Sequence, residues 1–142
     1  MGLLRQRDGA TCVRLGVTGG AVPAAGLRAA AEAAERFGTG AVHLTTRQTI
    51  EIPGVAEADL GEALDGLVAA GWSTAAGGPR VRAVVACPGA AWCRFGLVDG
   101  QALAERVAAH ARSRGDLPHK FKIAIAGCPN GCAKPVENDF GL

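Results

Sequence analysis

The chain has 142 residues, 49% of them hydrophobic, which fits one domain or two small subdomains with a real apolar core. Its formal net charge of +2, from 15 basic and 13 acidic residues, is too balanced for a general binder of nucleic acids or membrane surfaces. We see no signal peptide and no apolar run that approaches the roughly 18 residues of a membrane span, so we expect a cytoplasmic protein.

The first half of the chain predicts strand, helix, strand, strand and helix in that order. The hydrophobic patterns place strands at 11–18, 41–45 and 48–52, and helices at 24–37 and 57–70. Pro53 and Gly54 are expected to end the third strand. A short closing strand near 72–75 would complete a ferredoxin-like half-domain over residues 1–76. We interpret the Gly- and Pro-containing segment 76–79 as a linker.

The second half predicts an α/β domain over residues 80–142. Strands are expected at 80–86 and 120–126, with a helix at 99–113 for which Asp99 serves as N-cap. Each of the two strands runs directly into a loop that contains two cysteines. The predicted fold class is therefore α+β, a ferredoxin-like half-domain followed by an α/β cofactor domain.

Four of the five cysteines form two close pairs, and Cys12 stands alone as an expected core residue. The pairs are Cys87 with Cys93 and Cys128 with Cys132. Iron–sulfur clusters are usually held by four thiolates, and loops rich in Gly and Pro let the backbone approach a bulky cluster. Zinc also takes four thiolates, although five residues between the first two cysteines is wide for it. The pattern favours a cluster, with a zinc-stabilised binding module as the alternative.

Basic residues accompany the cysteine loops. Lys120 and Lys122 share one face of the predicted strand before the second pair, while Arg82 and Arg94 flank the first pair. Arg47 falls in a predicted turn, where a guanidinium can clamp a carboxylate or an oxyanion. Solvated surface charge is the alternative for these residues, since Lys and Arg are mostly exposed.

Four stretches of the sequence together resemble the sirohaem-containing sulfite and nitrite reductase family. They are HLTTRQTI at 43–50, CPGAAWCRFG at 87–96, LPHKFK at 117–122 and GCPNGCA at 127–133. The two cysteine loops are the most specific of these. The chain resembles the small members with a single repeat, and the resemblance implies a cofactor domain that continues beyond Leu142.

The resemblance implies a [4Fe–4S] cluster on the four paired cysteines, with Cys132 also bridging to the iron of sirohaem. The implied sirohaem contacts are Thr45, Thr46, Arg47, Gln48, Arg94, Asn130 and Cys132. The implied substrate-binding cations are Arg47, Arg82, Lys120 and Lys122.

The implied activity is the six-electron reduction of sulfite to sulfide or of nitrite to ammonia, and the residues do not separate these two oxyanions. The electrons would come from a donor such as ferredoxin, and a homo-oligomer is compatible with a single repeat. No nucleic-acid or membrane partner is expected. An electron-transfer module or partner subunit that carries a cluster without sirohaem is a further alternative.

Overall fold

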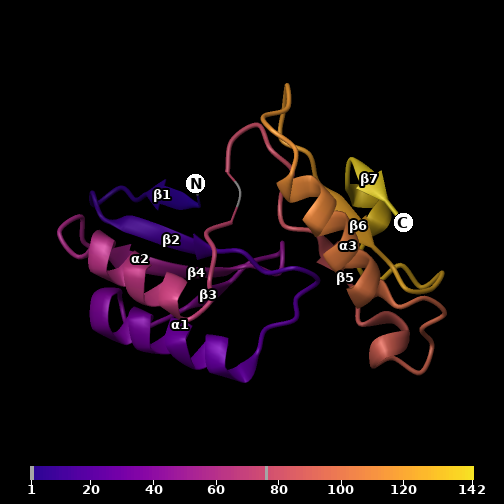
Figure 1. The fold of residues 1–142 in the computed structure, drawn as a ribbon, viewed down its shortest axis with the longest axis horizontal. Coiled ribbons are helices and arrows are strands. Elements are labelled where there is room, and N and C mark those ends of the chain that lie inside the picture. Colours follow the sequence, from indigo (N-terminus) through magenta and orange to yellow (C-terminus); the bar gives the residue numbers. More distant parts are fainter. Residues whose placement is uncertain (1, 76) are drawn as a thin grey trace. The chain divides into compact units, whose positions relative to one another are not determined.

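The computed structural model describes residues 2–75 and 77–142, which form two compact units (Figure 1). The first unit comprises the described residues of Met1–Gly16 together with Val22–Ala75. The second comprises Val17–Ala21 and the described residues of Ala76–Leu142. Met1, the start of the predicted half-domain, and Ala76, the start of the predicted linker, lie outside the described residues.

The first unit is an antiparallel sheet with two helices. Its strands follow the order β1-β2-β4-β3, with β1 at Leu3–Arg5, β2 at Thr11–Leu15, β3 at His43–Leu44 and β4 at Ile50–Val55. The helices are α1 (Ala24–Phe37), which contacts β4, and α2 (Leu60–Ala69), which contacts α1. Alternating apolar residues of the two central strands are buried, namely Val13, Leu15, Ile50 and Ile52.

The prediction that Pro53 and Gly54 end the third strand is wrong, because β4 continues to Val55. Val13 pairs with Ile52 while Thr11 pairs with Val55, so β4 carries one extra residue and forms a β-bulge. A bulge tolerates a proline that has no N–H for the ladder. Gly54 adopts a positive φ of 82° and donates its N–H to Gln6 Oε1 at 2.6 Å.

Other boundaries in this unit also differ from the prediction. The sequence did not predict β1, and β2 ends at Leu15, after which Val17–Ala21 joins the second unit. The helix predicted at 57–70 begins only at Leu60, because the preceding residues form a turn. The predicted closing strand is reduced to a single antiparallel bridge between Leu15 and Thr74.

The second unit is a parallel sheet with the strand order β5-β6-β7 and one long helix. The strands are β5 (Val85–Ala86), β6 (Ile123–Ile125) and β7 (Phe140–Gly141), and the helix is α3 (Gly100–Arg112). Asp99 is confirmed as the N-cap, since its Oδ1 accepts a hydrogen bond of 3.0 Å from the N–H of Ala102. The core between helix and sheet consists of Val84, Ala86, Ala104, Ala108, Ile123 and Ile125.

The strands of this unit are shorter than predicted. Ahead of β5 and β6 the two segments form an isolated parallel bridge between Val81 and Phe121. The sequence did not predict β7 or the short 3-10 turns at Gly89–Ala91 and Pro135–Glu137. In the part of the chain that the structure describes, no helix combines the length and apolar character needed to span a bilayer.

Candidate functional site

The two cysteine loops leave the same edge of the parallel sheet. β5 and β6 run parallel with Ala86 opposite Ile125, so the loops that follow these strands start side by side. The N–H of Cys87 donates to the carbonyl of Ile125 at 3.1 Å, which ties the first cysteine to the end of β6. Parallel pairing therefore brings together the starts of two cysteine loops that are about 40 residues apart in the chain.

Direct contacts at Gly127 join the two loops. Its N–H donates to Cys87 Sγ at 3.0 Å, and its carbonyl accepts from the N–H groups of Leu97 and Val98 at 2.8 and 3.1 Å. A Cβ at this position would lie 2.5 Å from Gly89 Cα, so only glycine allows the approach. Backbone N–H groups directed at cysteine sulfur stabilise the thiolate and tune the potential of iron–sulfur clusters.

The four cysteines of the two loops are free thiols, and their side chains differ in solvent exposure. Cys87, Cys93 and Cys128 are half-buried, and Cys132 is exposed. Among the residues described, no three Cys, His, Asp or Glu side chains already stand in a metal-binding arrangement. The structure thus places the two loops next to each other. Four thiols, a glycine-rich backbone and an amide directed at sulfur nevertheless fit the chemistry of a [4Fe–4S] cluster.

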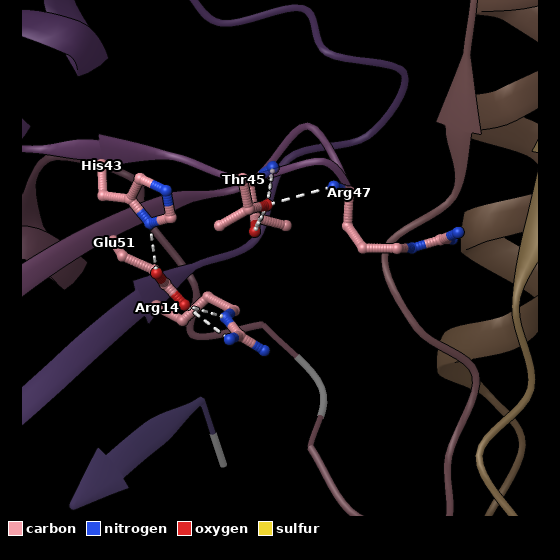
Figure 2. A network of polar contacts seen from close by, with 6 residues as sticks. Arg14, His43, Thr45, Arg47 and Glu51 are labelled. Atoms are coloured by element: carbon pink, nitrogen blue, oxygen red, sulfur yellow. Dashed lines mark hydrogen bonds and ion pairs between the residues drawn. The ribbon is translucent and has the colours of Figure 1, made fainter. Parts of the chain in front are cut away.

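The turn that carries Arg47 is built around the hydroxyl group of Thr45 (Figure 2). Thr45 Oγ1 lies 2.6 Å from Thr49 Oγ1 and accepts the N–H groups of Arg47 and Thr49, each at 3.2 Å. Gln48 takes a positive φ of 57° and donates its N–H to the carbonyl of Thr45 at 3.0 Å. Figure 2 shows the side chain of Arg47 extending away from Thr45. The hydroxyl group therefore fixes the backbone from which the guanidinium projects.

Three charged or titratable side chains form a row across the sheet beside this turn. Glu51 on β4 is the middle one, and it lies opposite Arg14 on β2 and His43 on β3. Glu51 Oε1 accepts from Arg14 Nε and Nη2 at 2.7 and 2.5 Å, and Oε2 lies 2.7 Å from His43 Nδ1 (Figure 2). Burial of the carboxyl group acts to raise the pKa of Glu51, but the hydrogen bonds from His43 and Arg14 outweigh it and the pKa is lowered. Sequence reasoning missed this row, since strand register decides which residues face each other.

The remaining predicted cations lie in the second unit. Lys120 is exposed and Lys122 half-buried, on either side of Phe121, and the N–H of Lys122 donates to Asp139 Oδ2 at 2.7 Å. The N–H of Arg82 donates to the carbonyl of Phe121 at 2.8 Å, which places the arginine backbone beside the two lysines. The structure thus places three of the four predicted substrate cations on two backbone segments that are hydrogen-bonded to each other.

The other predicted contacts are dispersed. Arg94 is exposed and stacks over Phe95, with 4.4 Å from Cζ to the ring centroid. Asn130 is exposed within the second cysteine loop, and Thr46 is exposed in the turn of the first unit. Cys12 is confirmed as a core residue. Burial raises the pKa of its thiol, the charge of Glu51 adds to this, and Arg14 partly offsets it.

Comparison with known proteins identifies both units. The family model described as the nitrite/sulfite reductase ferredoxin-like half domain matches residues 4–70, and that of the nitrite and sulphite reductase 4Fe-4S domain matches residues 77–142.

Curated relatives and a solved structure agree with these matches. The coenzyme F420-dependent sulfite reductase of Methanocaldococcus jannaschii is 41% identical over 101 residues, which cover 71% of this chain and 16% of that protein. The assimilatory ferredoxin-dependent nitrite reductase of Haloferax mediterranei is 36% identical over 110 residues, 75% of this chain and 19% of that protein. The structure of the Mycobacterium tuberculosis NirA protein superposes with a TM-score of 0.76 at 26% identity, covering 91% of this chain and 24% of that one. The chain thus spans less than a quarter of the length of each.

Proposed function

The chain belongs to the nitrite and sulfite reductase family, and we propose that it acts as a sirohaem-dependent oxidoreductase that reduces sulfite to sulfide or nitrite to ammonia. The observation that carries this proposal is the pair of glycine-rich cysteine loops joined at one sheet edge by the Gly127 contact to Cys87. Residues 1–76 would supply the ferredoxin-like half-domain and residues 80–142 the cofactor domain.

Cys87, Cys93, Cys128 and Cys132 would hold the [4Fe–4S] cluster. Cys132 is the exposed member of the four, which suits the additional role of meeting the sirohaem iron. When bound, the coupled cofactors would store electrons and deliver them singly to the substrate, the chemistry that side chains cannot provide. The protein would orient the cofactors and control the charge around them.

The cations would bind the oxyanion and the carboxylates of sirohaem. Arg47 projects from a turn that three hydrogen bonds to Thr45 hold in shape, so little conformational entropy is left to lose when an anion binds. Arg82, Lys120 and Lys122 add positive charge on neighbouring backbone segments and could donate protons as oxygen leaves the substrate. The further sirohaem contacts proposed are Thr45, Thr46, Gln48, Arg94 and Asn130.

A one-electron donor of the ferredoxin type is the electron source we propose. The name of the Haloferax relative specifies ferredoxin, whereas that of the Methanocaldococcus relative specifies coenzyme F420. Self-association of the single-repeat chain is part of the same proposal, and sedimentation of the cofactor-loaded protein would test it.

Anaerobic purification from a host with enhanced sirohaem synthesis tests the proposal. We expect about five irons per chain, four from the cluster and one from sirohaem, together with haem-like absorption bands and oxidation of reduced methyl viologen on addition of sulfite or nitrite. Serine at each of the four paired cysteines in turn should lower the iron content, whereas Cys12→Ala should keep it. A cluster without sirohaem bands or turnover would indicate an electron-transfer module instead, and zinc without iron would refute the cluster itself.

A further inference from the structure

The second unit contains an apolar groove along α3, here called the α3 groove. Its volume is about 550 Å³, within the roughly 300–1,000 Å³ that small-molecule sites occupy. The apolar part of its lining comes from α3 on one side and from the segment that enters β6 on the other, and includes Leu103, Val107, Ala111, Leu117, Phe121 and Ile123. Most of these side chains are only partly buried, so the groove is open to a ligand.

The groove lies away from the cysteine loops. Val81 and Phe121 line the groove, and they form a bridge between the segments that precede β5 and β6. The cysteine loops instead follow the C-terminal ends of these two strands. The start of α3 belongs to the cysteine end, because Gln101 Nε2 donates to the carbonyl of Cys87 at 3.2 Å. The groove uses the later turns of the helix, and it is therefore distinct from the proposed cluster site.

One side of the groove is basic. Arg106, His110 and Arg114 are exposed and spaced four residues apart, so they follow one another along the same face of α3 and beyond its end. Arg114 Nη2 lies 3.0 Å from His110 Nε2, which aligns these two side chains. None of the described residues that line the groove is acidic, and nearby Asp116 already accepts from Arg80 Nε at 2.7 Å.

We propose that the α3 groove binds a small organic anion with an aromatic or alkyl body and an acid group. The apolar floor would take the body of such a ligand out of water, and the basic side would hold the acid group near the surface, where it keeps part of its hydration. An uncharged apolar ligand would make no ion pair with the arginines, and an inorganic anion would leave the apolar lining of the groove in contact with water. The groove goes beyond the proposed reductase function and does not depend on it.

The intact chain can be titrated with anilinonaphthalene sulfonate, an aromatic anion whose fluorescence rises in apolar sites. We expect one site per chain. Ala111→Trp should abolish binding because the indole fills the groove. The double variant Arg106→Glu, Arg114→Glu should weaken it by about tenfold or more, since two attractions become repulsions. Arg112→Glu is the matched control, because this exposed arginine of α3 does not line the groove, and it should bind as the wild type does.

Phenylnaphthylamine, the uncharged analogue, separates charge from apolar contact. It should bind the wild type and the double arginine variant equally and should lose binding in Ala111→Trp. The proposal is overturned if the sulfonate binds all variants alike. It is also overturned if sedimentation shows that the wild type self-associates and excludes the probe while Ala111→Trp is monomeric, since a second copy would then occupy the groove. Displacement of the probe only by peptides, and not by alkyl carboxylates, would likewise replace the small anion with a protein segment.

Discussion

Glu51→Gln tests whether the cross-strand row stabilises the first unit. The substitution keeps the size of the side chain and one oxygen acceptor, but it removes the negative charge that Arg14 and His43 share. The side chain of Glu51 is only 12% exposed, so water cannot fully replace the lost partners. We expect the variant to fold and to be less stable at neutral pH.

The expected loss of stability follows from the three contacts that Glu51 makes with Arg14 and His43. Hydrogen bonds between two charged groups are the strongest, and the variant leaves bonds from a charged or neutral partner to an uncharged amide, so each of the three contacts loses roughly 1 kcal/mol. The side chain of Arg14 is 31% exposed and that of His43 67% exposed, so solvent screens the histidine contact most strongly. We expect the free energy of unfolding to fall by about 1–2 kcal/mol, which corresponds to a fall in Tm of about 5–10 °C for a unit of this size.

Fluorescence of Trp72 provides an assay confined to the first unit. This tryptophan donates its indole N–H to the carbonyl of Gly26 at 2.9 Å, and a Trp92→Phe background removes the signal of the second unit. Glu57→Gln is the matched control, because Glu57 and Arg5 are both more than 70% exposed and lie 3.9 Å apart. It should leave Tm within about 2 °C of the parent.

The pH dependence of stability provides a second test of the contribution of Glu51. The pKa of Glu51 is lowered in the folded state, so its contribution is complete above the unfolded value of about 4.3 and is lost as the pH falls through the folded value. The difference in stability between parent and Glu51→Gln should therefore shrink as the pH falls below about 4.3. An equal Tm at pH 7, or a difference that stays constant on acidification, would refute the reasoning.

Three further substitutions probe the second unit. Gly127→Ala should separate the cysteine loops and lower both the iron content and Tm, because the added Cβ meets backbone atoms at 2.5 Å, whereas Gly115→Ala should be tolerated since nothing lies within 4 Å of its Cβ. Asp99→Ala should destabilise α3 by about 1 kcal/mol in denaturant titrations while Asp99→Asn keeps the cap, and equal losses would argue against capping. Gln101 Nε2 donates to the carbonyl of Gly19 at 2.9 Å, so Gln101→Ala should speed hydrogen exchange at the N–H of Gly19, and an unchanged rate would show that this side chain does not anchor Val17–Ala21 in the second unit.

The sequence predicted those elements whose signals are local. The bounds of α1 agree with the prediction at both ends, because Pro23 precedes an alanine-rich run and Gly38 follows it. The cysteine loops were identifiable because strand, glycine and paired cysteines lie within a few residues of each other. The β-bulge at Pro53 was not predicted, since it depends on pairing with a strand about 40 residues earlier.

The contacts that shape the site depend on register and were therefore not predictable. Thr49 falls at a polar position of the predicted strand 48–52 and directly precedes β4 in the structure, yet it is 2% exposed because its hydroxyl turns toward Thr45. Glu51 faces Arg14 and His43 only in the observed alignment of three strands. A shift of one residue in β4 would move Glu51 to the opposite face of the sheet.

The way in which the two cysteine loops meet has a consequence for cluster assembly. β5 and β6 have only two and three residues, so the ladder between them is a weak restraint on the loops. Gly127 adds hydrogen bonds to Cys87, Leu97 and Val98, all made by the protein itself. These bonds restrain the two loops in addition to the ladder, so they reduce the loop entropy that would be lost when the four cysteines are held around a cluster. The glycine at 127 is thus as much a part of the proposed site as the cysteine that follows it.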